Sequence, residues 1–246
     1  MAQDQMSIKA DQPLPAGSEV SSAEFDRFSD DYQRMLDQTV RITGEKGDYF
    51  AELKARYLVA LQGSTFAGTV LEFGCGVGLL SQHLLRHFPA CRLHGFDVSR
   101  SSLDMIPLAI SARARFTAIE NELSSDYDLI VTANVMHHIP PPERQDALGR
   151  MQKRLAKGGR LVVFEHNPLN PLTRIAVKQC PFDEGVSLLW PGELLNYFKG
   201  AGLSLEKRDY ITFFPRALAW LRPFESGLAW CPLGAQYVMV GRQNRS

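Results

Sequence analysis

The stretch VLEFGCGVG, Val70 to Gly78, places three glycines at alternate positions directly behind an apolar run that carries Glu72. A glycine-rich turn between a strand and a helix usually holds a ligand, because glycine lets the backbone turn sharply and approach the ligand closely. Two very different classes of ligand use such a turn. The residues around the turn indicate which of the two classes of ligand it binds.

The loop departs from the dinucleotide pattern. In a GxGxxG loop the last glycine allows close packing of helix and strand, and the helix faces a pyrophosphate. Here Leu79 occupies the position of that last glycine. Glu72 also lies at the end of the strand, where its carboxylate would repel a pyrophosphate but attract an ammonium or sulfonium group. We therefore expect a ligand that is positively charged at this end.

A second acidic residue, Asp97, ends the stretch RLHGFD and follows Gly78 by 19 residues. An acidic residue about twenty positions beyond the loop, at the end of the second strand, normally accepts hydrogen bonds from ribose hydroxyls. A ligand with a ribose at one end and a cationic amino-acid portion over the glycines is S-adenosylmethionine (AdoMet). An NAD(P)-dependent reductase stays open as an alternative if Leu79 replaces the packing glycine without cost.

Strand-like and helix-like stretches alternate through the middle of the chain. This alternation predicts an α/β fold, a Rossmann-like doubly wound sheet of seven mostly parallel strands with helices on both faces. We expect strands at 69–73, 92–98, 115–119, 128–134, 160–165, 203–214 and 236–241, and helices at 78–88, 99–112, 142–159 and 191–200. Ligands in such sheets bind at the carboxyl ends of the strands.

We predict one domain that is preceded by a tail and a helical lid and that carries an insert. Residues 1–21 carry charges and prolines where a signal peptide would need an unbroken apolar core, and we expect a flexible tail. Residues 22–61 have a helical pattern and are expected to form a lid. The AdoMet-binding domain is expected at 62–246, with an acceptor-binding insert at about 166–200.

Composition narrows the class of protein. Lys plus Arg and Asp plus Glu both number 27, so the chain has no net positive charge that would attract nucleic acid. No run of about eighteen apolar residues predicts a membrane-spanning helix. The four cysteines show neither CxxC pairing nor the spacing of metal ligands, which suits a reducing compartment. We expect a cytoplasmic protein without a metal site.

The segments LEFGCGVG, HGFDVS and LAKGGRLVVFE, in this order, resemble the class I AdoMet-dependent methyltransferases, in particular the core of the small-molecule, ubiquinone- and menaquinone-type enzymes. The resemblance covers roughly Thr69 to Glu165. It implies AdoMet as cofactor, and FDRFSDDYQ resembles the aromatic segment that many of these enzymes fold over it. The cofactor-binding residues implied in this way are Tyr32, Glu72, Gly74, Cys75, Gly76, Gly78, Asp97, Val98, Glu120, Asn121 and Asn134.

Methyl transfer from a sulfonium is an in-line displacement, so most of the acceleration can come from positioning the acceptor and excluding water. A hydroxyl or acidic carbon acceptor also benefits from a base with a pKa near neutrality. His137 and His138 in NVMHHI follow the fourth predicted strand, and Glu165 and His166 end the fifth. These four are the candidate catalytic residues, and each also has a purely structural interpretation in packing and hydrogen bonding.

Acceptor specificity is expected from the regions least like the shared core. Arg174 and Lys178 would share a helix face, where they either meet an anionic group of the substrate or are solvated. The segment 210–234 is rich in aromatic residues, which could wall an apolar acceptor pocket, touch a bilayer interface as a peripheral membrane contact, or pack in the core.

The sequence thus predicts a methyltransferase for a small-molecule or lipid-like acceptor, with O-methylation slightly favoured. A non-catalytic AdoMet-binding partner subunit also stays open.

Overall fold

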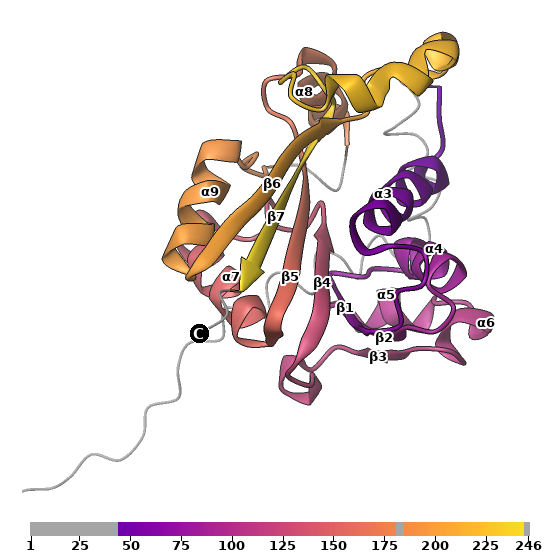
Figure 1. The fold of residues 1–246 in the computed structure, drawn as a ribbon, viewed down its shortest axis with the longest axis vertical. Helices are drawn as coiled ribbons and strands as arrows, with labels where there is room; N and C mark the ends of the chain where they lie inside the picture. The colour runs from indigo at the N-terminus through magenta and orange to yellow at the C-terminus, as the bar shows by residue number, and fades with distance from the viewer. Residues whose placement is uncertain (1–43, 181–184, 244–246) are drawn as a thin grey trace, which may run out of the picture.

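The computed structural model describes residues 44–180 and 185–243. Its centre is a seven-stranded sheet with the strand order β3-β2-β1-β4-β5-β7-β6, in which only β7 runs antiparallel to its neighbours (Figure 1). The strands are β1 Thr69–Phe73, β2 Arg92–Phe96, β3 Arg115–Thr117, β4 Tyr127–Ala133, β5 Leu155–His166, β6 Leu203–Ile211 and β7 Gln236–Gln243. The predicted fold class is confirmed.

Helices cover both faces of the sheet. One face packs against α3 Gly47–Gln62, α4 Leu79–His87, α5 Arg100–Asp104 and α6 Leu108–Ser111. The other packs against α7 Arg144–Lys153 and α9 Pro191–Gly200. The remaining elements are α8 Pro171–Gln179, the short 3-10 segments η3 Glu120–Glu122 and η4 Pro141–Glu143, and the longer 3-10 segment η6 Arg216–Leu228. None of the described helices combines the length and apolar character needed to cross a bilayer.

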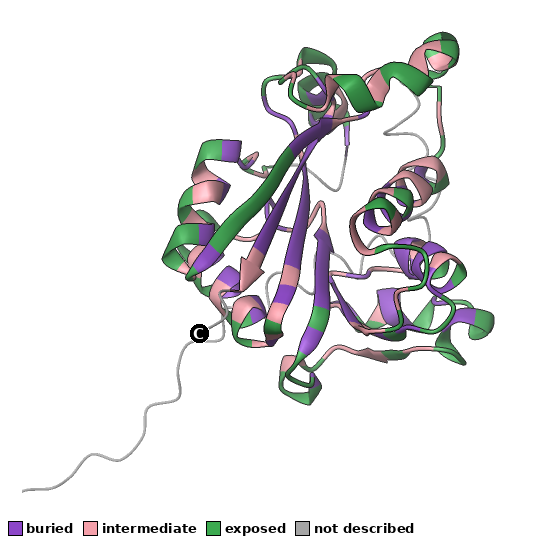
Figure 2. Ribbon diagram, viewed as in Figure 1, coloured by how far each residue is buried: buried purple, intermediate pink, exposed green. Residues whose placement is uncertain are grey.

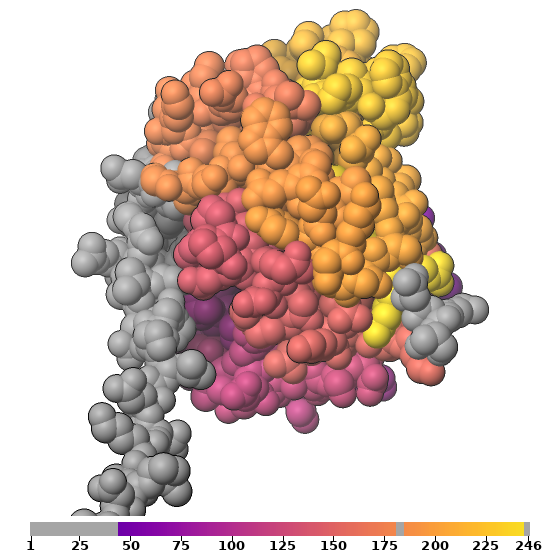
Figure 3. All heavy atoms as spheres, turned by 90° about the vertical axis from the view of Figure 1, so that its left-hand side faces the viewer, coloured from indigo at the N-terminus to yellow at the C-terminus, as the bar shows by residue number. Residues whose placement is uncertain are grey.

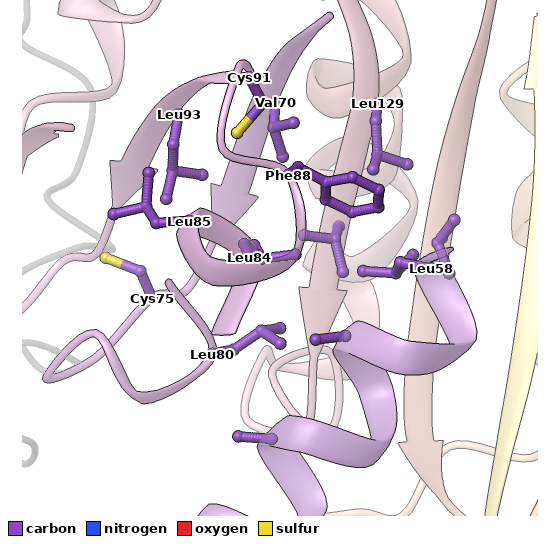
Figure 4. Packing of buried hydrophobic residues seen from close by; sticks show 14 of the residues in the cluster. Leu58, Val70, Cys75, Leu80, Leu84, Leu85, Phe88, Cys91, Leu93 and Leu129 are labelled. Carbon is purple, nitrogen blue, oxygen red and sulfur yellow. The ribbon is translucent and has the colours of Figure 1, made fainter. Parts of the chain in front are cut away.

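The two faces of the sheet follow from strand periodicity, since successive side chains point to opposite sides. Leu129 and Val131 of β4 join the cluster beneath α3 and α4, which Figure 4 shows in close-up, whereas Ile130 joins the cluster beneath α7 and α9. The central strands are therefore buried on both faces (Figure 2), as parallel sheets usually are.

The structure differs from the sequence prediction at the start of β5. The predicted helix at 142–159 ends as α7 at Lys153, and the KGG stretch belongs to β5. The reason lies in tertiary pairing: Leu155 pairs with Tyr127 of β4, and the Tyr127 N–H donates to the Arg154 carbonyl. A Cβ at Gly159 would lie 2.7 Å from the Tyr127 carbonyl oxygen, so this contact needs glycine.

The predicted helix at 99–112 is two short helices, α5 and α6. The Ser99 side chain accepts from the Ser102 N–H and so caps α5, while Pro107 precedes α6. Of the predicted lid, α3 lies within the described residues, whereas 22–43, including Tyr32, lies outside them. The domain boundaries stay predictions, and the 3-10 segment η6 was not predicted.

Candidate functional site

The three glycines of the first loop all adopt positive φ angles, +79° at Gly74, +50° at Gly76 and +80° at Gly78. A side chain at any of them would be strained, because L-residues with a Cβ rarely adopt this region. At Gly74 space is also lacking, since a Cβ there would lie 2.3 Å from a Cγ atom of Val135. The loop after β1 therefore packs directly on the loop after β4.

The amides of this loop are already hydrogen bonded within the protein. Gly74 and Cys75 both donate to the Phe96 carbonyl, at 2.7 and 3.0 Å, and Gly78 donates to Cys75 at 2.9 Å. Gly76 donates to the Asp97 carboxylate at 2.7 Å. A pyrophosphate-binding loop would instead turn such N–H groups towards the phosphates. These four amides are thus not arranged as an anion site.

Two carboxyl groups lie beside the loop. Glu72 is buried and accepts a short hydrogen bond from the Ser81 hydroxyl of α4. Burial, with a smaller contribution from the charge of Asp97, raises the pKa of Glu72 to about 8 against the opposing effect of the Ser81 hydrogen bond. Asp97 also accepts from the Ser99 N–H at 2.9 Å. This donor-poor, carboxyl-rich surrounding fits a ligand with a cationic end, as AdoMet has.

Two exposed aliphatic side chains, Val98 and Ile119, follow β2 and β3 at the same edge of the sheet. They offer an apolar surface suited to a flat heteroaromatic ring. Val98 is among the predicted cofactor-binding residues, whereas Ile119, the last residue of the predicted strand 115–119, is not; its exposed side chain two residues after β3 makes it a further candidate. Of the two residues predicted for the adenine, Asn121 is exposed. Glu120 pairs with Arg150 and Arg154 at 3.1 and 3.6 Å.

The fourth strand ends at a strained residue. Asn134 has a φ of +57°, its N–H donates to the Phe164 carbonyl at 2.9 Å, and its side-chain oxygen accepts from Gln236 at 3.3 Å. The other amide atom of Gln236, Oε1, is buried and has no hydrogen-bond partner. Strain and an unsatisfied polar atom together are features that concentrate at functional sites.

Glu165 anchors the loop that follows Asn134. Its Oε1 accepts from the Met136 N–H at 2.8 Å, and its Oε2 lies 2.5 Å from the His137 Nδ1, with both side chains fully buried. Burial alone would raise the pKa of Glu165, but the imidazoles of His137, His166 and His138 hold it below its ordinary value. Both carboxylate oxygens are thus used within the protein.

Three imidazole rings gather around this anchor. The His137 ring lies 4.2 Å from the His138 ring and 5.1 Å from the His166 ring, measured between centroids. His138 and His166 are both partly exposed, whereas His137 is buried. The structure therefore brings all four predicted catalytic candidates together at the carboxyl ends of β4 and β5, and their roles stay predictions.

Lys54 of α3 is a buried basic residue that was not among the predicted site residues. It is buried together with Ala51, Ala55 and Leu58, and burial lowers its pKa to about 8 against the opposing effect of the Glu165 charge. Its place on the apolar stripe of a helix was the signal in the sequence, because a lysine there cannot reach bulk water easily. Lys54 is thus a buried basic group whose charge interacts with that of Glu165.

Comparison with known proteins agrees with this geometry. Residues 71–161 match the model of a methyltransferase domain. This stretch therefore has the sequence pattern of a methyltransferase domain. The predicted resemblance is thereby confirmed for 71–161, and AdoMet is the cofactor of such methyltransferases.

Among curated proteins, an uncharacterized methyltransferase of Schizosaccharomyces pombe is 30% identical over 161 residues, 55% of this chain and 53% of the relative. A ubiquinone biosynthesis O-methyltransferase of Vibrio cholerae is 24% identical over 143 residues, 54% and 56% of the two chains. The matched part thus spans about half the length of these relatives.

Among solved structures, the magnesium protoporphyrin IX methyltransferase of Synechocystis with bound S-adenosylhomocysteine has a TM-score of 0.62 at 15% identity, covering 91% of this chain and 99% of that one. At this identity the similarity establishes the fold.

Proposed function

We propose that this chain transfers the methyl group of AdoMet to a small-molecule or lipid-like acceptor, with oxygen as the preferred acceptor atom. The observation that carries the proposal is the pair of carboxyl groups, Glu72 and Asp97, beside a glycine loop whose amides are hydrogen bonded internally. A cationic ligand gains from the Asp97 carboxylate and favours ionisation of Glu72, whereas a pyrophosphate would meet the charge of Asp97 and find the four loop amides already engaged.

Different residues of the chain would contact different parts of AdoMet. Asp97 would exchange its hydrogen bond to Gly76 for the ribose hydroxyls, and Val98 and Ile119 would contact the adenine. Glu72 would stabilise the cationic end of AdoMet from below the loop. Asn134 and its neighbours would face the methionine portion, since the two loops are in contact at Gly74 and Val135.

The histidine cluster supports oxygen as the acceptor atom. Glu165 would orient His137 through Nδ1, and the His138 and His166 rings, which both lie close to the His137 ring, would face an acceptor hydroxyl. Removing the hydroxyl proton as the oxygen attacks the methyl carbon makes the oxygen a stronger nucleophile, and S-adenosylhomocysteine leaves as a neutral thioether. Of the two partly exposed rings, His138 is the first candidate for the base.

A calorimetric titration with AdoMet, S-adenosylhomocysteine and NADPH tests the cofactor half of this proposal. We expect both AdoMet and S-adenosylhomocysteine to bind and NADPH not to bind. Mass-spectrometric screening of phenols, quinones and prenylated phenols with AdoMet tests the acceptor half, with a mass increase of one methyl group as the expected result. Tight binding of NADPH without AdoMet binding would overturn the proposal.

A further inference from the structure

An exposed apolar surface occupies one end of the molecule. It is formed by the 3-10 segment η6 with the residues that follow it, and by α8, which lie side by side at the top of Figures 1 and 3. The side chains of Asn170, the N-cap of α8, and of Thr173 donate to the Leu233 and Ala235 carbonyls, which fixes this arrangement. We call it the η6–α8 surface, and its large exposed apolar residues are Leu169, Leu172, Ile175, Leu218, Trp220, Phe224, Trp230 and Leu233.

The side chains of η6 are at least partly exposed to solvent. None of its residues is buried, although its sequence RALAWLRPFESGL contains several large apolar side chains. Trp220 is 70% exposed, Phe224 66% and Trp230 76%. Several large apolar side chains exposed on neighbouring segments indicate an interaction site, because isolated exposed apolar residues need no partner but a group of them does.

The segment is nevertheless well anchored. Arg222 pairs with Glu45 at 2.8 Å and lies 4.4 Å from the centroid of the Tyr49 ring. The Glu225 carboxylate accepts from both the Phe213 and the Phe214 N–H groups, at 3.0 and 2.9 Å. The backbone is thus held by polar contacts while the apolar side chains face solvent, which indicates a presented surface.

We propose that the η6–α8 surface docks onto an anionic lipid bilayer, with Trp220, Phe224 and Trp230 inserted at the interface. Tryptophan is favoured there because its indole combines a large apolar ring with an N–H donor. The charges agree with this occupant: Arg174, Lys178 and Arg216 are exposed beside the apolar residues, whereas the acidic Glu45 and Glu225 are engaged by Arg222 and by backbone amides. Exposed basic groups attract anionic headgroups.

The position of the η6–α8 surface in the fold also favours membrane docking. The η6–α8 surface follows the ends of β5 and β6, the edge at which the histidine cluster lies. Docking there would bring this edge close to the membrane. The inference concerns binding alone, so it stands or fails independently of methyl transfer.

Sedimentation with phosphatidylglycerol/phosphatidylcholine vesicles tests the proposal on the full chain. We expect the protein to pellet with these vesicles, less with pure phosphatidylcholine, and less again as salt rises. The triple variant Trp220→Ser, Phe224→Ser, Trp230→Ser should partition about ten-fold or more weakly, because it loses most of the apolar area available to the interface. Leu108→Ser on α6, which is 81% exposed, is the matched control and should bind like the wild type.

Tryptophan fluorescence gives a second measurement. The chain has three tryptophans, so Trp190→Phe leaves Trp220 and Trp230 as the only indoles. We expect a blue shift of emission on anionic vesicles and quenching by brominated lipids. No vesicle binding by the wild type, or unchanged binding by the triple variant, would overturn the proposal. A dimer of the wild type in sedimentation velocity that the triple variant abolishes would assign the surface to a second copy instead.

Discussion

His137 and Glu165 form a fully buried pair in which the imidazole Nδ1 lies 2.5 Å from the carboxylate Oε2. The other carboxylate oxygen holds the Met136 N–H, so one side chain at the end of β5 fixes the loop after β4. Buried pairs of this kind stabilise little in total, but removing one partner leaves an uncompensated group in the interior.

The first prediction concerns stability. His137→Ala should lower the free energy of unfolding by about 3–5 kcal/mol, because the Glu165 carboxylate would stay buried without its imidazole partner. Urea unfolding followed by circular dichroism measures this. His87→Ala is the matched control, since His87 pairs with Glu52 at 3.0 Å in a partly exposed position, and its loss should cost at most about 1 kcal/mol. Equal effects of the two substitutions would contradict an anchoring role for the buried pair.

The second prediction concerns the base. His138→Gln should lower kcat by about 10²–10⁴-fold with a hydroxyl acceptor, while AdoMet affinity and stability stay near the wild-type values, because the ring lies on the cluster's accessible side. Single-turnover kinetics with the acceptor found by screening measures the effect. His166→Gln serves as the comparison for the second accessible ring. If His166→Gln slows the reaction and His138→Gln does not, His166 rather than His138 is the base.

A third prediction concerns the ribose. Asp97→Ala should weaken AdoMet binding by about 1–3 kcal/mol, the scale of a lost charged hydrogen bond. Calorimetric titration measures the affinity. Because Asp97 also accepts from Gly76 and Ser99, Asp97→Asn is the informative control. It keeps one side-chain oxygen for the loop amides but loses the charge. Unchanged affinity in the alanine variant would show that the ribose lies elsewhere.

Local signals in the sequence were enough to predict several elements of the fold and the place of the candidate catalytic residues. The strand β1 matches the predicted 69–73, and α9 matches 191–200, because a glycine loop ends the first and a proline begins the second. The four predicted catalytic residues meet because parallel strands end at one edge of the sheet.

What the sequence could not show depends on tertiary contacts. The pairing of His137 with Glu165 joins residues 28 positions apart, and only the packed sheet brings Nδ1 to the carboxylate. The early start of β5 depends on Leu155 pairing with Tyr127. The burial of Lys54 depends on where α3 lies on the sheet, and the exposure of Trp220 reverses the usual expectation for an aromatic residue.

The last prediction concerns protons and Glu72. Its pKa in the folded protein is raised to about 8, so at pH 7 the carboxyl group is mostly protonated. A cationic ligand favours the ionised form and lowers this pKa, so AdoMet binding at pH 7 should release a fraction of a proton, and affinity should rise as pH increases towards 8.

Titration calorimetry in buffers with different ionisation enthalpies counts these protons. Glu72→Gln provides the baseline, because the ligand's own ammonium group titrates equally in both proteins, and this variant should bind AdoMet more weakly with a flatter pH dependence. Glu120→Gln, which removes a carboxylate paired with Arg150, should release protons as the wild type does. Equal proton release by the wild type and Glu72→Gln would mean that the buried carboxyl group does not sense the ligand's charge, and the electrostatic basis for AdoMet over a dinucleotide would be lost.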